Sequence, residues 1–135
     1  VRSRRFMEEF KITIPNNPGA LADMTKQIAE AGANIEAISA VVPHMWDGLD
    51  GVPSLPEGSG TVCIITDDAE STRYALRGCG AHYTTKQVHE KMLTDMPGSL
   101  SDFLNHKSQK KINITSLQVL PPQSDGTIRI GYTTD

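Results

Sequence analysis

The sequence lacks the features that mark membrane-spanning, secreted and nucleic-acid-binding proteins. No apolar run approaches the roughly 18–20 residues of a membrane-spanning helix, and no basic segment followed by an apolar one predicts a secretory signal. Aromatic residues make up 5% of the 135 residues, and 13 basic and 16 acidic residues give a net charge of −3. Nucleic-acid-binding proteins typically carry a basic surface with stacking aromatics, so this composition argues against that class. The basic cluster of Arg2, Arg4 and Arg5 is expected to be a loose chain end.

Cysteine is also scarce. Cys63 and Cys79 are the only two cysteines in the sequence, which is too few for a disulfide framework. Cys63 lies in an apolar run and is expected to be a buried small hydrophobe. Cys79 lies between two glycines at an expected helix end. With no export signal apparent, we expect a reduced, cytoplasmic setting.

Catalytic and cofactor motifs are missing as well. The sequence contains no glycine-rich phosphate loop, no dinucleotide-binding glycine pattern and no common serine-hydrolase or zinc-protease motif. His89 and its neighbour Glu90 are expected on opposite faces of a strand, so they cannot act together. We therefore predict a protein that is not an enzyme and that needs no metal ion or cofactor.

An internal repeat organises the chain. Residues 14–41 align with residues 93–120 without a gap at an offset of 79. The matches include two dipeptides of each copy: Pro18-Gly19 with Pro97-Gly98, and Asn34-Ile35 with Asn113-Ile114. Agreement at both dipeptides without a gap indicates that the chain holds two copies of one structural unit.

Local patterns predict the elements of the first copy. Phe10, Ile12 and Ile14 alternate with polar residues, which is typical of a half-buried strand. Asn17 is a suitable helix N-cap, with Pro18 in the first turn and an apolar stripe behind it. Together the segments give the expected order: strand 10–14, a helix ended by Gly32 as a left-handed cap, strands 34–42 and 60–66, a helix capped by Asp67 or Asp68, and strand 82–86. This βαββαβ order predicts an α+β, ferredoxin-like fold, an antiparallel sheet with two helices on one face.

The second copy is incomplete. Its helix and three strands are recognisable between 87 and 135, but no second helix or fourth strand follows. We expect two domains, 6–86 and 87–135, with the second truncated. One edge of the second sheet would then lack a partner strand, and an open edge favours pairing with another chain. A homodimer is the resulting hypothesis.

A long polar insertion lies between the second and third strands of the first copy, over residues 44–59. Matching Gly60-Thr61 with Gly126-Thr127 gives an offset of 66, which implies 13 extra residues. Loops of this length are commonly functional or disordered. Two interpretations stay open: a lid or partner grip anchored by Trp46, or a mobile hairpin. Its acidic residues do not have the spacing of an EF-hand calcium loop.

The run Asn17-Pro18-Gly19-Ala20-Leu21, then a helix, then Gly32-Ala33-Asn34-Ile35, resembles the ACT domain. The second copy is similar, with Asp95-Met96-Pro97-Gly98 and Asn113-Ile114 at matching places. ACT domains are small ferredoxin-like modules that sense amino acids and other small ligands. The resemblance implies a non-catalytic regulatory protein, commonly dimeric, that holds its ligand at interfaces between paired domains.

Elementary chemistry supports a ligand site at the start of the helix. A helix N-terminus offers unpaired N–H groups and a partial positive charge, and Gly19 lets a ligand approach the backbone. The resemblance implies ligand-binding roles for Asn16, Asn17, Gly19, Ala20, Leu21, Asn34 and Ile35, and for Asp95, Met96, Gly98, Asn113 and Ile114 of the second copy. Asp95 replaces Asn16 there and would repel a carboxylate or prefer an ammonium group. The alternative is that these residues only cap the helix and shape the turn that follows it.

The sequence thus predicts a regulatory protein that binds an amino acid or a similar small ligand and passes the signal to another protein, such as a metabolic enzyme or a regulator. The alternative is a subunit that binds no ligand and docks on a metabolic enzyme. An enzyme on a ferredoxin-like scaffold ranks behind both.

Overall fold

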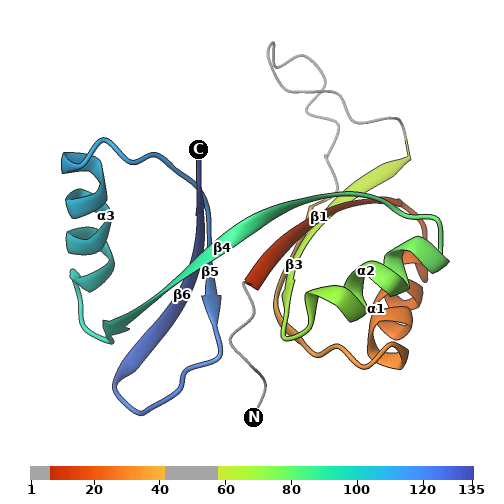
Figure 1. Cartoon of the computed structure of the whole chain (residues 1–135), viewed down its shortest axis with the longest axis horizontal. Helices are drawn as coiled ribbons and strands as arrows, with labels where there is room; N and C mark the ends of the chain where they lie inside the picture. Colours follow the sequence, from red (N-terminus) through yellow and green to blue (C-terminus); the bar gives the residue numbers. More distant parts are fainter. Residues whose placement is uncertain (1–6, 42–57) are drawn as a thin grey trace. The chain divides into compact units, whose positions relative to one another are not determined.

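The computed structural model describes residues 7–41 and 58–135 (Figure 1). The expectations for the arginine cluster and for the insertion up to residue 57, Trp46 included, lie outside these residues. The chain forms two compact units. We call Glu8–Thr85 the N-terminal unit and Lys86–Asp135, to which Met7 also belongs, the C-terminal unit.

The N-terminal unit has the predicted ferredoxin-like βαββαβ order. Its elements are β1 (Met7–Pro15), α1 (Ala20–Glu30), β2 (Ile35–Val41), β3 (Ser59–Thr66), α2 (Ala69–Gly78) and the first part of β4 (His82–Thr94). The strand order is β2-β3-β1-β4, and β3 pairs antiparallel with both β2 and β1. Figure 1 shows α1 and α2 on one side of these strands. The predicted fold class is confirmed.

The core of the N-terminal unit lies between the sheet and its two helices. Strands β1 and β3 direct alternate apolar side chains to one face, as the period of two in the sequence predicts. The buried residues are Phe10, Ile12, Val62 and Ile64 from the strands, Met24, Ile28 and Ala33 from α1 and the turn after it, and Ala75 and Leu76 from α2. The apolar stripe that the sequence predicts for this helix consists of Leu21, Met24, Ile28 and Ala29, but only Met24 and Ile28 are buried, and Leu21 and Ala29 are exposed.

The start of α1 differs from the predicted cap. Asn17 does not cap the helix: the N-cap position belongs to Gly19, whose φ is +91° and which makes no side-chain cap bond. The Asn17 carbonyl accepts a hydrogen bond from the Ala20 N–H (3.3 Å), so the Asn-Pro-Gly segment forms a tight turn before the helix. The predicted cap of α2 is confirmed, because the Asp68 carboxylate accepts a bond from the Ser71 N–H (3.1 Å).

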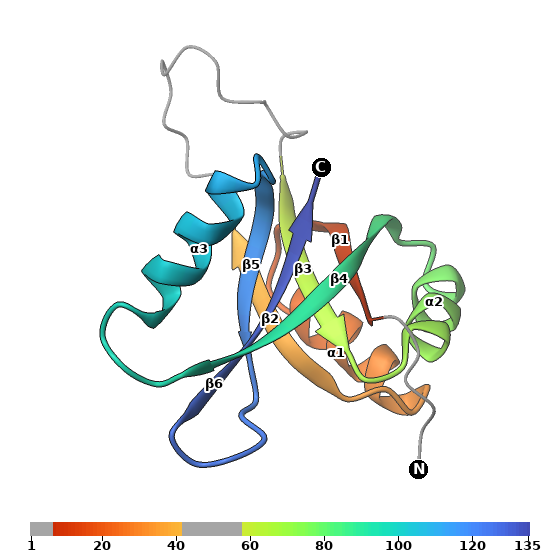
Figure 2. The same cartoon turned by 60° about the vertical axis from the view of Figure 1, so that its left-hand side comes forward.

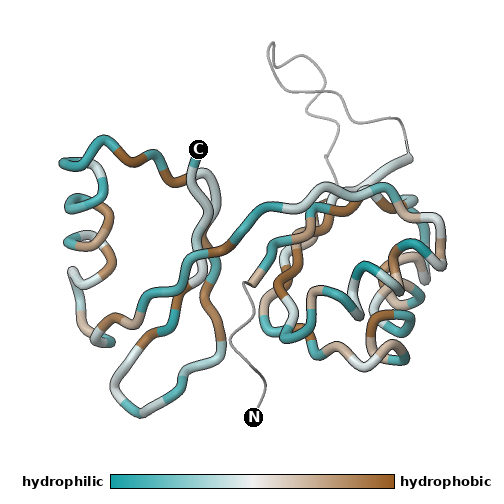
Figure 3. The backbone as a smooth tube through the Cα atoms, in the orientation of Figure 1, coloured by the Kyte–Doolittle hydropathy of each residue, from teal (hydrophilic) through white to brown (hydrophobic). Residues whose placement is uncertain are grey.

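The C-terminal unit is built from the rest of β4 with α3 (Ser99–Gln109), β5 (Ile114–Leu120) and β6 (Thr127–Thr134). Its strand order is β4-β6-β5, with antiparallel pairs. Figures 1 and 2 show α3 along one face of these strands, and Figure 3 shows that α3 is mostly hydrophilic. One core cluster of this unit contains Phe103, Ile130 and Tyr132, with Leu93, Ile114, Leu117 and Ile128 packed around them.

The two units share one strand register. Pro15 pairs with Ser59 in the first, and Thr94 pairs with Thr127 in the second. The same offsets relate the other pairs: β1 and β2 lie 79 residues before their counterparts in β4 and β5, and β3 lies 68 residues before β6. The register irregularity early in β2 recurs at the matching place in β5. The alignment offset of 66 was therefore wrong. Gly58, not Gly60, corresponds to Gly126, and the insertion has 11 extra residues, the difference between 79 and 68.

The three helices in the described residues end in the same way. In α1, the Gly32 N–H donates to the Ala29 carbonyl (3.0 Å) and the Ala33 N–H to the Ile28 carbonyl (3.2 Å). This pair of hydrogen bonds is the Schellman motif, which requires a residue in the left-handed conformation. The predicted Gly32 cap is thus confirmed, with a φ of +94°. In α3 the left-handed residue is Lys111, with a φ of +59°.

Cys63 is only half-buried, so the expectation of a fully buried thiol was wrong. It pairs with Lys11 across the strands, on the sheet face opposite the helices. Burial and the nearby Glu9 carboxylate raise the pKa of the Cys63 thiol. Cys79 is exposed at the end of α2. Within the described residues, no helix is long and apolar enough to span a membrane.

The left-handed Lys111 allows a stability test. A residue with a Cβ pays about 1 kcal/mol or more in this conformation, whereas glycine does not. Because glycine also makes the unfolded chain more flexible, we expect Lys111→Gly to raise the free energy of unfolding by about 0.5–1 kcal/mol, measured by urea denaturation. Lys110→Gly is the matched control, since Lys110 has a φ of −84° and should lose stability. Equal losses in both variants would contradict this account.

Candidate functional site

The turn before α1 contains four of the predicted ligand residues close together. Asn16, Asn17 and Gly19 are exposed, and Ala20 begins the helix. The Gly19 carbonyl accepts a bond from the Asp23 N–H (2.8 Å). The N–H groups of Leu21 and Ala22 donate to no other group in the described part of the chain. These two N–H groups point along the helix axis toward the turn and are open to an anion.

The turn before α3 repeats this geometry. Gly98 has a φ of +90° and its carbonyl accepts a bond from the Asp102 N–H (2.9 Å). Asp95 and Met96 are exposed, as their counterparts are. The difference is chemical, because the Asp95 carboxylate places a negative charge where the first turn has the neutral amide of Asn16.

Asn34 and Asn113 lie just before β2 and β5 and are tied to an aspartate that follows the neighbouring strand. The Asn34 N–H donates to the Asp67 carboxylate (2.8 Å), and the Asp67 N–H donates back to the Asn34 carbonyl (3.0 Å). In the second copy the Asn113 side-chain amide donates to the Asp135 carboxylate (2.8 Å). Asn34 therefore uses its backbone for this contact and keeps its exposed side chain available, whereas the Asn113 side chain is engaged.

Neither unit brings its two groups of predicted residues together. The turn precedes the helix in each unit, and the asparagine follows the end of that helix. An α-helix of 11 residues is about 16 Å long, which is too far for one amino acid to contact both groups. A site that uses both would need the turn of one domain and the asparagine of another.

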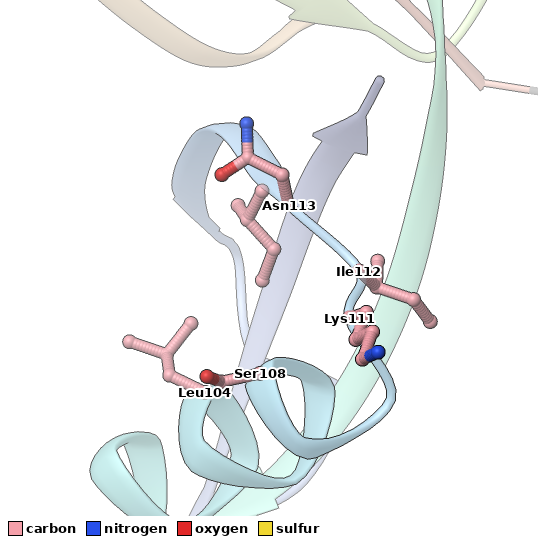
Figure 4. A pocket seen from close by; sticks show the side chains of 6 residues that line it. Leu104, Ser108, Lys111, Ile112 and Asn113 are labelled. Carbon is pink, nitrogen blue, oxygen red and sulfur yellow. The ribbon is translucent and has the colours of Figure 1, made fainter.

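A shallow cavity borders the end of α3 and the start of β5 (Figure 4). Its volume is about 450 Å³. Two predicted residues, Asn113 and Ile114, line it, together with Leu104, Ser108, Lys111 and Ile112, which the sequence analysis did not single out. In Figure 4 the Asn113 amide extends away from α3. The alignment of the two copies already shows a difference in this region, because Lys111 stands where the first copy has Gly32.

Comparison with known proteins shows which solved structures share this fold. No protein-family model and no curated protein sequence matches the chain. Among solved structures, a protein from Bacteroides thetaiotaomicron is similar with a TM-score of 0.74 and 16% identity, over 95% of this chain and 78% of that one. The ligand-free regulatory subunit of aspartate kinase from Thermus thermophilus gives a TM-score of 0.64 and 15% identity, over 96% and 82%. The chain has the fold of the ACT-domain proteins. The regulatory subunit of aspartate kinase from Thermus flavus shares this ACT fold, with a TM-score of 0.60 and 17% identity over the same fractions.

The contacts of Asn34 predict different effects on stability from the loss of its backbone contact and the loss of its side chain. Asp67→Ala removes a side-chain acceptor from the Asn34 N–H, so we expect a loss of about 1 kcal/mol in the free energy of unfolding. Asn34→Ala keeps the backbone contact and should change stability by less than about 0.5 kcal/mol. Urea denaturation of both variants measures the difference. A larger loss in Asn34→Ala would show that its side chain is structural, and would argue against a ligand role.

Proposed function

We propose that this protein is a non-catalytic regulator that binds an amino acid or a similar small ligand between paired ACT-type domains. The observation that carries the proposal is the division of the predicted site between the two ends of one helix. The turn offers N–H groups to a carboxylate, while the asparagine that would complete the contact set lies about a helix length away. Pairing of two domains would bring the two groups together.

The first turn is the better ligand site of the two. A carboxylate at the Leu21 and Ala22 N–H groups gains hydrogen bonds and roughly 0.3–1 kcal/mol from the helix dipole. The Asn16 amide can donate to that carboxylate or accept from an ammonium group. Asp95 at the second turn would oppose a carboxylate. We therefore assign the main contacts to Asn16, Asn17, Gly19, Ala20, Leu21, Asn34 and Ile35, with weaker roles for Asp95, Met96, Gly98, Asn113 and Ile114.

Two further observations support this view. The shared strand register supports two tandem domains, 6–86 and 87–135, of which the second holds no counterpart of α2 within this sequence. Two similar structures are regulatory subunits of aspartate kinase, which supports a regulatory role here. Binding would then act by linkage, because a ligand that prefers the paired state shifts the population toward it.

Thermal unfolding in the presence of each of the twenty amino acids tests the proposal. A ligand at about 100 times its dissociation constant adds about 2.7 kcal/mol of stability, which raises Tm by several degrees for a chain of this size. We expect one or two amino acids to do so, and Asn16→Ala to abolish the shift. Asn105→Ala, an exposed asparagine on α3, is the control that should retain it.

The opposite result selects the alternative. If no amino acid raises Tm, or if Asn16→Ala and Asn105→Ala respond alike, the turn is only a helix start. The protein would then be an assembly subunit that docks on a metabolic enzyme. The exposed apolar residues of strand β2, Ile38 and Val41, are 46% and 63% exposed and would suit such a contact.

Pairing itself is a separate prediction. Strand β2 ends the strand order of the N-terminal unit, and an edge strand with exposed apolar residues favours pairing with a second copy. We expect a homodimer by light scattering, and we expect Ile38→Lys with Val41→Lys to give monomers. Ser101→Lys with Asn105→Lys adds the same charge on α3 and should stay dimeric. A wild-type monomer at all concentrations would remove the pairing model.

A further inference from the structure

A line of partly exposed apolar side chains runs along α3. Leu100 and Leu104 lie four positions apart, which places them on one face of the helix, and they are 39% and 36% exposed. Met96, in the turn before the helix, is 61% exposed, and Ile112, which follows the helix, is 36% exposed. Ser108 continues the spacing of four between Leu104 and Ile112. These residues give one face of α3 an apolar character along its length.

The same face is exposed in the N-terminal unit, where two helices lie on the sheet. With the offset of 79, Leu21 is the counterpart of Leu100 and Ala29 is the counterpart of Ser108, and both are exposed on α1. The exposure of this face is therefore a property of the first helix of each copy. It does not depend on whether a second helix accompanies it.

The second copy is more apolar than the first on this face. Three of its residues are larger and more apolar than their counterparts: Met96 for Asn17, Leu104 for Thr25, and Ile112 for Ala33. Exposed apolar area is unfavourable in water, and the polar or smaller residues of the first copy support the same helix. Apolar residues that gather on an exposed face commonly mark an interaction surface.

Two lysines border the end of this apolar line. Lys110 and Lys111 are exposed where the first copy has Ala31 and Gly32, and neither forms an ion pair within the residues that the structure describes. Lys111 has a φ of +59°, which is unfavourable for a residue with a Cβ. Backbone strain of this kind is commonly retained where the residue has a function. The two ammonium groups favour an acidic partner.

The distribution of charge along the chain also favours this position for an acidic partner. Residues Lys86–Asp135 include six basic and five acidic residues, whereas Glu8–Thr85 include four basic and eleven acidic residues. An acidic partner would therefore be repelled by the N-terminal unit and attracted to the lysines at the end of α3.

The shallow cavity beside α3 lies where Ser108 interrupts the apolar line. Leu104, Ser108, Lys111 and Ile112 are among the residues that line it, and Figure 4 shows Leu104 and Ser108 beside each other on the helix. Small-molecule sites enclose most of the surface of their ligand, which a shallow cavity does not do. A single apolar side chain of a protein partner can fill it while the rest of that partner contacts the apolar line.

We call this region the apolar–basic surface and define it as Met96, Leu100, Leu104, Lys110, Lys111 and Ile112. We propose that the apolar–basic surface docks an acidic amphipathic helix of another protein, the target of the proposed regulator. Apolar residues three or four positions apart on that helix would pack along α3 and into the cavity. Its carboxylates would lie near the two lysines.

This inference rests on the proposed function in one respect, because it names the partner of the regulator. The apolar–basic surface belongs to the C-terminal unit, whereas the first turn belongs to the N-terminal unit. Peptide docking and amino-acid binding are measured separately, so either can fail without the other.

A phage-displayed library of helical peptides, selected on the full 135-residue chain, tests the proposal. We expect the enriched peptides to combine apolar residues three or four positions apart with neighbouring Asp or Glu. By fluorescence anisotropy, such a peptide should bind Leu104→Ser with Ile112→Ser about tenfold more weakly or worse, because apolar contacts are lost. Tyr74→Ser is the control, since it removes an apolar residue of α2 that is 77% exposed, and it should bind as the wild type does.

Lys111→Gly separates docking from folding. We expect this variant to be more stable, because glycine relieves the left-handed strain, and yet to bind the peptide about three- to tenfold more weakly, because a cation is lost. Lys110→Gln should also weaken binding, whereas Lys26→Gln, which alters an exposed lysine of α1, should not. These lysine variants also serve if Leu104→Ser with Ile112→Ser does not fold.

Several results would overturn the proposal. One is a selection that gives no binder, or binders without acidic residues, and another is equal binding by the wild type and all the folded variants of the apolar–basic surface. A smaller mass by light scattering for Leu104→Ser with Ile112→Ser than for the wild type would assign the surface to a second copy of this chain. Binding to vesicles of phosphatidylcholine and phosphatidylserine that this variant loses would assign it to a membrane.

Discussion

The length of one helix limits which of the predicted residues a single small ligand can contact. A short turn precedes the helix and an asparagine follows it, and 11 helical residues separate them. Hydrogen bonding fixes the rise of an α-helix at about 1.5 Å per residue, so the separation cannot be shortened by a change of side chains. A ligand as small as an amino acid meets either the turn or the asparagine within one unit. Binding that uses both is therefore coupled to association of domains, which is how a small ligand can act as a signal.

The backbone at both ends of this helix is closely determined in each unit. Gly19 and Gly98 adopt nearly the same left-handed φ, and each carbonyl accepts the same bond from the residue four positions on. At the other end, the Schellman bonds fix the direction of the chain into the next strand. These local bonds explain how two copies with few identical residues keep one strand register. They also leave the side chains of the turn free to differ, as Asn16 and Asp95 do.

The sequence was informative wherever a residue acts locally. Alternation in β1, the cap at Asp68 and the left-handed Gly32 follow from propensities of single segments, and the structure confirms them. It was less informative where two conformations share a pattern. An Asn-Pro-Gly segment suits either a capped helix start or a turn ending in a left-handed glycine, and only the latter forms here.

Other features depend on partners distant in sequence. The Asn16 N–H donates to the Gly58 carbonyl, so the strand register brings Gly58 rather than Gly60 to the first turn. Sequence alignment misses this because it matches the Gly60-Thr61 and Gly126-Thr127 dipeptides. The Asn34 N–H donates to the carboxylate of Asp67, which lies 33 positions later in the chain. Cys63 lies in an apolar run, yet part of it stays accessible because it faces away from the helices. Periodicity predicts which residues alternate, but not how completely the outer face is covered.

The difference between the two units is informative for the same reason. An apolar residue is kept at a sheet position when an apolar element covers it, because exposure costs about 25 cal/mol per Å². Phe10 and Ile12 meet that condition, and α2 covers them. His89 and Lys91 occupy the same register positions and are exposed, with side chains that favour water. The second copy therefore keeps the backbone of the first and gives this face a different chemistry.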